Sequence, residues 1–408
     1  MTELEEVVIV DFLRTAMSRS RQPKDAARDV FNCYRADDLA AMVLKELVKR
    51  QKFDAKEIDE VITGTAYPVG ENWLYGGRIP LILAGLPETV PAMGVERQCA
   101  SSMTSIHSGA MEIMTGNSQI VVAGGMEHMT HIPMVNEHII LNPRLQDPVT
   151  KKSAPDLAQY DLDTGFVMIQ TAQKLWEQNP AITRKMMDEW ALRSHQLASK
   201  AKAEGYFDGE ILPVMGKNPD GSDVLIKYDQ SIRDGAKLED MEKLPIVSRK
   251  ITKEPGITAG NSSPLNAGAS YCVLMSRKKA NQLGIKPLAK IKAISWAAVS
   301  PGVMGKGPVP ASRKALAKAG LKADDIDIWE INEAFAIIPL YAMQELKIPS
   351  EKVNIKGGGI ALGHALGLTG CRIVCTAARI LQQTGKKYAL ATPCIGGGQG
   401  TATIIERI

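Results

Sequence analysis

Features that mark several common protein classes are scarce in this 408-residue chain. It has six cysteines and no Cys-x-x-Cys pair, so we expect neither a disulfide framework nor a zinc site. Cys371 and Cys375 are four residues apart, and we interpret them as buried positions of one helix. No uninterrupted apolar run approaches the roughly 20 residues that a membrane span requires. The net charge of +4 is small and forms no basic block, so nucleic-acid binding is not indicated.

The amino-terminal residues also lack the pattern of a targeting segment. The chain starts Met-Thr-Glu-Leu-Glu-Glu, whereas a secretory signal starts with basic residues and a mitochondrial presequence avoids acidic ones. We therefore expect a cytoplasmic protein. Its composition, 45% hydrophobic and 23% charged, is ordinary for a globular chain long enough for two or more domains.

Strands and helices alternate along the chain, which predicts an α/β protein whose sheets are covered on both faces. In the first third, we expect a helix at 38–50 and a strand at 60–65. A second helix follows Cys99 and ends at Thr115-Gly116. It leads into the strand Ile120–Ala123, which we expect to stop at Gly124-Gly125 because glycine commonly marks a turn.

The last third repeats this plan. Asp59 and Asp327, which precede equivalent strands, are 268 residues apart, and the helix ends Thr115 and Thr384 are 269 apart. Such agreement indicates an internal duplication. The stretch between the repeats has no counterpart and reads as an inserted loop domain covering a site. The predicted domains are an N-terminal half (1–127 and 252–283), a loop domain (128–251) and a C-terminal half (284–408).

Cys99 lies at the junction between an extended segment and a helix. The unpaired N–H groups and the positive end of the helix dipole at such a junction favour a thiolate, so Cys99 is a candidate nucleophile. A lone cysteine is more commonly a small buried apolar residue. What favours a functional interpretation lies near the other end of the chain.

Three carboxy-terminal motifs are rich in groups that chemistry uses. Glu330–Ala336 (Glu-Ile-Asn-Glu-Ala-Phe-Ala) is at a strand-to-helix junction, Gly357–Ala365 surrounds His364 with glycines, and Cys394–Gly400 directly follows a strand. Glycine lets the backbone approach a ligand closely. Taken singly, such motifs are usually a turn, a structural histidine or a helix cap.

Together with the Cys99 stretch, these motifs closely resemble the thiolase family, over essentially the whole chain. Further agreement comes from Arg14-Thr15, Gly124–Glu127, Thr258–Ser263 and Gly307–Ala311. Within the family, Glu127–Met129 and His131–Met134 resemble the degradative 3-ketoacyl-CoA thiolases. The resemblance implies a five-layered αβαβα core built from two similar halves, which fits the duplication found independently.

The resemblance also implies roles for individual residues. Cys99 would be the nucleophile that takes the acyl group, and His364 would activate its sulfur. Cys394 would be the second acid/base, which protonates the acetyl-CoA enolate in cleavage. Asn332 would hold a water that forms one oxyanion hole with His364. The N–H groups of Cys99 and Gly396 would form the other.

For the substrate, the family implies coenzyme A and acyl-CoA, with no permanently bound cofactor and no metal. By resemblance, Ser263 and Ala259 would lie beside the pantetheine arm, Met168 and Phe335 would line the reactive end, and Arg233 would contact a phosphate. Family members form dimers or dimers of dimers, and some act with a further enzyme subunit. We therefore expect a homodimer or homotetramer. The segment 138–163 could serve tetramer assembly, docking of a partner or covering of the pocket.

Three residues depart from the family pattern. Ala365 replaces a proline beside the histidine, which would loosen that loop. Glu96 replaces an asparagine; its charge would oppose thiolate formation at Cys99, unless it pairs with Arg97 or faces away. Ile169 adds bulk after Met168. These changes leave the acyl specificity open.

Three other functions remain as alternatives. The first is the same chemistry run as acetyl-CoA condensation to acetoacetyl-CoA. The second is a decarboxylating ketoacyl synthase, which uses a cysteine with two C-terminal-half histidines, whereas only His364 follows His195 here. The third is a non-catalytic acyl-CoA-binding subunit, against which the retention of the whole catalytic set argues.

Overall fold

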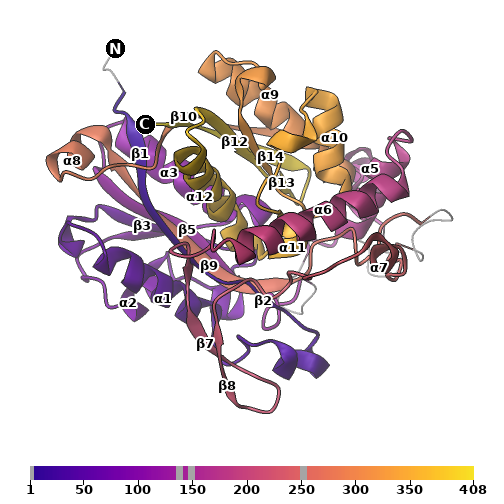
Figure 1. Cartoon of the computed structure of the whole chain (residues 1–408), viewed down its shortest axis with the longest axis horizontal. Helices are drawn as coiled ribbons and strands as arrows, with labels where there is room; N and C mark the ends of the chain where they lie inside the picture. The colour runs from indigo at the N-terminus through magenta and orange to yellow at the C-terminus, as the bar shows by residue number, and fades with distance from the viewer. Residues whose placement is uncertain (1–3, 135–140, 146–151, 249–254) are drawn as a thin grey trace.

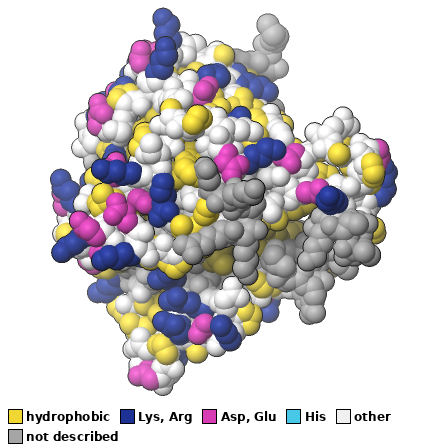
Figure 2. Space-filling view, turned by 90° about the vertical axis from the view of Figure 1, so that its right-hand side faces the viewer, with side chains coloured by type: hydrophobic (Ala, Val, Ile, Leu, Met, Phe, Trp, Pro, Cys, Tyr) yellow, Lys and Arg dark blue, Asp and Glu magenta, His cyan; other side chains and the backbone are white. Residues whose placement is uncertain are grey.

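A computed structural model describes residues 4–134, 141–145, 152–248 and 255–408 (Figure 1). Its main sheet joins two halves in the strand order β4-β3-β5-β9-β1-β10-β14-β12-β11. The link between the halves is short, because β1 and β10 pair only through Val8–Lys290 and Ile9–Ala289. The face drawn in Figure 2 carries basic and acidic side chains interspersed, in keeping with the small net charge.

The two halves have the same topology. In the first, β3 is parallel to β4 and β5, β5 is antiparallel to β9, and β9 is antiparallel to β1. In the second, β11 is parallel to β12, β12 is antiparallel to β14, and β14 is antiparallel to β10. A parallel bridge from Trp329 to Val353 takes the place that β4 has in the first half. The strands are β1 (Val7–Thr15), β3 (Glu60–Gly64), β4 (Ala92–Val95), β5 (Ile120–His128), β9 (Asn266–Ser276), β10 (Ala289–Ala298), β11 (Ile328–Ile331), β12 (Tyr388–Thr392) and β14 (Gln399–Arg407).

Helices complete five layers. The central pair, α3 (Ser101–Met114) and α12 (Leu366–Thr384), pack against each other, and α12 contacts strands of both halves. The outer layers are α1 (Ala36–Lys49) over the first half and α9 (Pro308–Ala319) over the second, beside which lies α10 (Ile337–Leu346). The predicted five-layered αβαβα core is confirmed. Because α12 has protein on every side, its residues from Leu366 to Ala378 are all buried.

One sequence prediction about this core is wrong. The strand expected to stop at Gly124-Gly125 continues as β5 to His128 and is buried throughout. These glycines are there because of close packing. A Cβ on Gly124 would meet the Ser270 carbonyl oxygen at 2.1 Å, and one on Gly125 would meet the Gly367 carbonyl oxygen at 2.3 Å. They let α12 and β9 approach the strand, so they are not turn residues.

The chain between β5 and β9 corresponds to the stretch that the sequence predicts as an insertion, and it contains the two expected helices. Its helices α5 (Met168–Glu177) and α6 (Arg184–Ala203) agree with the expected 169–178 and 183–203. The hairpin β7 (Val214–Lys217) and β8 (Asp223–Ile226) was not predicted. The expected border at 251/252, His138 and part of the expected assembly segment lie outside the described residues. The other short elements are β2 (Ser18–Arg19), β6 (Ile211–Leu212), β13 (Cys394–Ile395), α2 (Arg78–Leu83), α4 (Leu162–Gly165), α7 (Leu238–Glu242), α8 (Arg277–Gln282) and α11 (Gly359–Leu362).

Within the described parts of the chain, no helix is long and apolar enough to cross a membrane. All six cysteines are free.

Candidate active site

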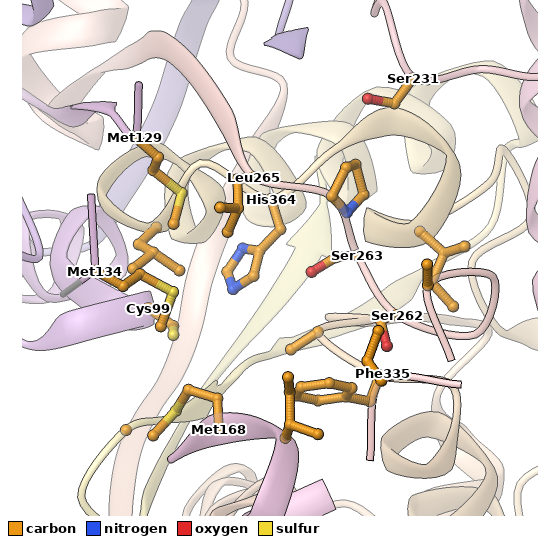
Figure 3. Close-up of a pocket in the computed structure, with 18 of the residues that line it drawn as sticks. Cys99, Met129, Met134, Met168, Ser231, Ser262, Ser263, Leu265, Phe335 and His364 are labelled. Atoms are coloured by element: carbon orange, nitrogen blue, oxygen red, sulfur yellow. The ribbon is translucent and has the colours of Figure 1, made fainter. Parts of the chain in front are cut away.

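A cavity of about 760 Å³ lies between the insertion and the core (Figure 3). In the view shown, Cys99, Met129 and Met134 lie on one side of the His364 ring, and Ser262, Ser263 and Phe335 lie on the other. Eight of the ten predicted site residues line this cavity: Cys99, Met168, Arg233, Ala259, Ser263, Phe335, His364 and Gly396. The other two, Asn332 and Cys394, are buried directly behind its wall, as described below.

Cys99 is in a short 3-10 turn, Gln98–Ala100, that runs directly into α3. Gln98 has a left-handed backbone with φ of 44°, which is uncommon for a residue other than glycine. Local bonds fix this turn: the Ser101 hydroxyl lies 2.7 Å from the Gln98 carbonyl oxygen and accepts from the Arg97 N–H at 3.0 Å. The predicted strand-to-helix junction is therefore present and holds the Cys99 sulfur at the cavity wall.

The expected preference of Cys99 for a thiolate is wrong for the resting site. Burial raises the pKa of the thiol to about 11, although the N–H groups of Gly396 and Cys99 itself lower it. Desolvation disfavours the charged form more strongly than these donors favour it. Glu127 and Glu96 add small effects in the same direction as burial. Cys99 thus rests as a neutral thiol, and converting it to a thiolate requires a base.

His364 is buried, and its hydrogen bonds define its tautomer. The Thr369 hydroxyl donates to the Ala365 carbonyl oxygen at 2.8 Å, so it accepts from His364 Nδ1 at 2.7 Å. Nδ1 therefore carries the proton, and Nε2 presents a lone pair. Burial, aided by the charge of Arg372, lowers the pKa of His364 to about 3. The ring is neutral at ordinary pH, so Nε2 carries no proton and can accept one.

Asn332 lies beside this lone pair. It directly follows β11, and its Nδ2 is 3.2 Å from His364 Nε2. Its Oδ1 is buried without a protein partner in the part of the chain that the structure describes. An amide with one free acceptor next to the imidazole is suited to hold a water molecule there.

Cys394 approaches Cys99 from the opposite half. It lies in β13, which packs against the turn that carries Cys99. Cys394 is fully buried, and burial and the nearby Cys99 raise its pKa well above the ordinary value. A second neutral thiol beside the first can give a proton to a carbanion and take one back. Gly396 follows two residues later, and a Cβ there would have the side chains of Gln98 and Met168 as its nearest neighbours, at 3.6 and 3.8 Å, which are ordinary contact distances.

The predicted coenzyme A residues form the outer wall. Ser263 donates its N–H to the Ala334 carbonyl oxygen at 3.0 Å, and Ser262 forms a backbone bridge with Phe335. These contacts join the segment before β9 to the one after β11. Arg233 lines the same cavity as Arg19. Arg19 was not among the predicted site residues. Burial and the charges of Arg233 and Arg28 lower the pKa of Arg19.

Arg19 forms no ion pair with any described residue, although other cations surround it. Like charges collected at a cavity wall favour an anionic ligand. Only the fold brings Arg19 to Arg233, so the sequence alone gave no signal for this pair.

Beside Cys99 is a small apolar cluster that was also missed. It consists of Ala66, Met129 and Leu366, with Tyr67 and Met134 packed against it. These side chains come from three segments and pack in one cluster with Cys99, so the sulfur lies against nonpolar surface.

The three departures from the family pattern have clear structural outcomes. Glu96 is exposed and accepts from the backbone and side chain of Gln98, at 2.8 and 3.0 Å, rather than pairing with Arg97. Ala365 is buried with φ of −75°, a value that proline also adopts. Ile169 lines the cavity, as expected for added bulk there.

Fold and site together define an enzyme of the thiolase family, to which the chain belongs. Residues 7–278 match the thiolase N-terminal domain, and residues 285–407 match the thiolase C-terminal domain.

Individual relatives are similar over their full length. The chain is 42% identical over 408 residues to a 3-ketoacyl-CoA thiolase of Alcanivorax borkumensis, covering 99% of each chain. It is 40% identical over 411 residues to a 3-ketoacyl-CoA thiolase of Aliivibrio fischeri, covering 99% of this chain and 100% of the relative. The crystal structure of the Bacillus anthracis acetyl-CoA acetyltransferase superimposes with a TM-score of 0.85 at 35% identity, covering 100% of both chains.

Proposed function

We propose that the protein cleaves a 3-ketoacyl-CoA with coenzyme A, giving acetyl-CoA and a shortened acyl-CoA through an acyl-cysteine intermediate. The observation that carries this proposal is the placement of Cys99, a neutral His364 and the Gly396 N–H around one cavity. The names of the relatives support the degradative direction.

In the first half-reaction, His364 Nε2 takes the proton of Cys99, and the sulfur attacks the 3-keto carbon. The C2–C3 bond then breaks, leaving the acyl group on Cys99 and an acetyl-CoA enolate. Cys394 gives its proton to C2, and acetyl-CoA departs. Donors aimed at each developing oxyanion are worth roughly 3 kcal/mol apiece. Asn332 with His364 would serve one oxyanion, and the N–H groups of Cys99 and Gly396 the other.

In the second half-reaction, the Cys394 thiolate removes the thiol proton of a second coenzyme A. This sulfur attacks the acyl-cysteine carbonyl, and Cys99 leaves as a thiolate that regains the proton held on His364. All groups return to their starting states, so no redox partner, metal or resident cofactor takes part. Splitting the reaction this way predicts ping-pong kinetics.

The walls suggest where each part of the substrate lies. Ser263, Ala259, Met168 and Phe335 would contact the pantetheine arm and the reactive thioester, while Arg233 and Arg19 would contact phosphate. The acyl group on Cys99 would lie in the apolar cluster around it. Two of those side chains are methionines, whose flexibility accommodates different acyl shapes.

We further propose that the chain forms a homodimer through the edge of its first half. β4 is the last strand on that side of the sheet. Four apolar side chains of the preceding segment are each more than half exposed: Trp73, Tyr75, Ile82 and Leu83. An unpaired edge beside exposed apolar residues suits pairing with a second copy. A homotetramer, or assembly with a further enzyme subunit, would build on this dimer.

The proposed domain division is the predicted one: 1–127 with 252–283, then 128–251, then 284–408. A cytoplasmic location is also proposed, because six free thiols suit a reducing compartment.

The direct test is thiolysis of a panel of 3-ketoacyl-CoAs, from acetoacetyl to long-chain and aryl, following loss of the 3-keto thioester. Turnover of longer members is expected. Activity on acetoacetyl-CoA alone would favour the biosynthetic alternative, and none on any member would contradict the proposal.

A further inference from the structure

Three backbone N–H groups in the segment that carries His364 each donate to a side chain from elsewhere in the fold. The Ile360 N–H donates to Glu333 Oε2 at 3.1 Å, and the His364 N–H donates to Asn266 Oδ1 at 2.8 Å. The Gly367 N–H donates to Glu127 Oε2 at 3.1 Å. The segment 360–367 is therefore held before, at and after the catalytic histidine.

The three acceptors come from separate strands. Glu127 is in β5, Asn266 begins β9, and Glu333 follows β11. All three side chains are fully buried. Neither carboxylate forms an ion pair with any described residue, so neutral donors alone satisfy them. Burying a carboxyl group without a cation is costly, and burial raises the pKa of Glu127 to about 7. A side chain that served only packing would not require this cost.

Glu333 joins the histidine segment to the insertion and to Asn332. Besides Ile360, it accepts from Trp190 Nε1 at 3.0 Å and Ser194 Oγ at 2.7 Å, both on α6. Asn354 Nδ2 donates to it at 2.8 Å. Because Glu333 directly follows Asn332, the same contacts fix the amide that faces the imidazole.

Glu127 joins the histidine segment to the nucleophile turn. It accepts from the Ala66 N–H at 2.8 Å and from the side chains of Thr65 and Asn72. The Ala66 carbonyl oxygen in turn accepts from Gln98 Nε2 at 3.0 Å, one residue before Cys99. Glu127 thus connects the supports of Cys99 and His364.

Glycines give this segment high conformational freedom. It follows three consecutive glycines, and Gly363 has φ of 117°, which other residues rarely adopt. A Cβ at Gly363 would lie 2.9 Å from the Asn266 side chain, so that side chain also fills the space beside the bend. Displacing a catalytic group by about 1 Å can cost a factor on the order of 100 in rate.

We propose that Glu127, Asn266 and Glu333 act together as positioning residues that fix the backbone of 360–367 and so the imidazole of His364. This inference rests on the proposed function, in which His364 is the base. None of the three touches the reacting atoms; each acts through the histidine.

The test compares Glu127→Gln, Asn266→Ala and Glu333→Gln. Each glutamine keeps the size of the side chain, but its amide NH₂ replaces one carboxylate oxygen. A hydrogen-bond donor then faces the N–H or O–H groups that the oxygen had accepted from. In thiolysis, each variant is expected to lose about 10- to 100-fold in kcat with KM changed less than threefold. In spectra of histidine-labelled protein, where His364 is one of six histidines, its signal should shift or broaden while that of His107 stays.

The matched control is Glu210→Gln. Glu210 is also a fully buried carboxylate, but it forms ion pairs with Arg14 and Arg379 and no hydrogen bond or ion pair with residues 360–367, all of which the structure describes. This variant should lose stability while kcat and the His364 signal remain unchanged. If Glu333→Gln fails to fold, Glu333→Asp, which keeps the charge but shortens the side chain, is expected to fold with an intermediate kcat.

Unchanged kcat in the three variants would overturn the proposal. So would a loss of kcat that leaves the His364 signal unmoved or raises KM in parallel, since that would indicate general structural damage. Failure of the proposed function is distinguishable: wild-type protein would then turn over no substrate, while the His364 signal would still report whether the three residues hold it.

Discussion

The two halves share a sheet topology but begin their central helices in different ways. In the first half, a 3-10 turn fixed by bonds within a few residues leads into α3 and presents Cys99. In the second, a glycine-rich segment leads into α12 and presents His364, and side chains from three distant strands hold it. Duplication supplied two helix starts that face one cavity. The Cys99 turn combines bonds within a few residues with two longer-range contacts, from Gln98 Nε2 and Ser101 Oγ to the carbonyl oxygens of Ala66 and Thr65. The backbone around His364 depends on side chains from three distant parts of the fold, so we expect it to be more sensitive to remote substitutions.

Of the substitutions that test this difference between the halves, His364→Ala is expected to have the largest effect on activity. Without its base, Cys99 keeps a pKa near 11 and is almost entirely thiol at neutral pH. We expect kcat to fall by about 10³-fold. The residual activity should rise about tenfold per pH unit between pH 7 and 9, because the thiolate fraction increases in that proportion. A fall below tenfold, or a flat pH profile, would contradict the assigned role.

Cys394→Ala tests whether acylation of Cys99 and proton transfer at C2 depend on different residues. The variant should still be acylated at Cys99 by an acyl-CoA, because His364 takes the Cys99 proton and coenzyme A can leave as a thiolate without a proton from Cys394. Exchange of the α-proton of acetyl-CoA should fall at least about 100-fold, since that step needs the second acid/base. Exchange is followed by loss of deuterium from labelled acetyl-CoA. Normal exchange or turnover would show that another group does this work.

Glu127, in the first half, is expected to make the stability of the protein depend on pH. Burial raises its pKa from 4.5 to about 7, so folding favours the protonated form. The contribution of Glu127 to the free energy of unfolding is fully present below its pKa in the unfolded chain. This contribution is lost as the pH rises through its pKa in the folded protein. The stability advantage of wild type over Glu127→Gln should fall by about 2 kcal/mol between pH 5 and 8. Urea unfolding at both pH values measures this; a constant or growing advantage would contradict it.

Arg19→Gln tests whether the core, as well as the insertion with Arg233, contacts the anionic end of the substrate. We expect KM for coenzyme A to rise about tenfold with kcat within twofold, since such a contact acts on binding. Lys24→Gln, an exposed position outside the cavity wall, is the control and should leave KM unchanged. Equal behaviour of the two variants would remove Arg19 from the site.

The smallest effect concerns the residue at the start of α12. Ala365→Pro should stabilise the protein by about 0.4–1 kcal/mol, because the φ of −75° suits proline and the unfolded chain loses freedom. Activity should be retained. Thermal unfolding and thiolysis measure both, and a lower midpoint would show that the segment cannot accept the ring.

Much of the fold followed from the sequence because it depends on local pattern. Alternating strands and helices, and the repeat at 268–269 residues, predicted two similar halves around one site. The strand through Gly124-Gly125 was missed because glycine reads as a turn, while its reason here, the approach of Ser270 and Gly367, involves residues far along the chain.

The sequence predicted which residue types form the site, but it did not predict their burial, their pKa values or their hydrogen-bond partners. The motifs identified Cys99 and His364, but the raised pKa of Cys99 comes from burial, which one sequence does not show. Of the two expectations for Glu96, that it faces away from Cys99 fits its exposure, but its partner Gln98 was not predicted, because the unusual backbone of Gln98 brings its N–H to that carboxylate. Arg19 and the three positioning residues act through contacts that only the folded chain creates.

The central claim is that the acyl group is carried on Cys99, and the most direct test is to measure intact protein mass. Wild type and Cys99→Ala are each incubated, without free coenzyme A, with a 3-ketoacyl-CoA that the wild type cleaves in the thiolysis assay. The account predicts one added acyl group per wild-type chain and none on the variant, which should still bind coenzyme A. Turnover without an adduct in wild type, or an adduct that persists in Cys99→Ala, would contradict it.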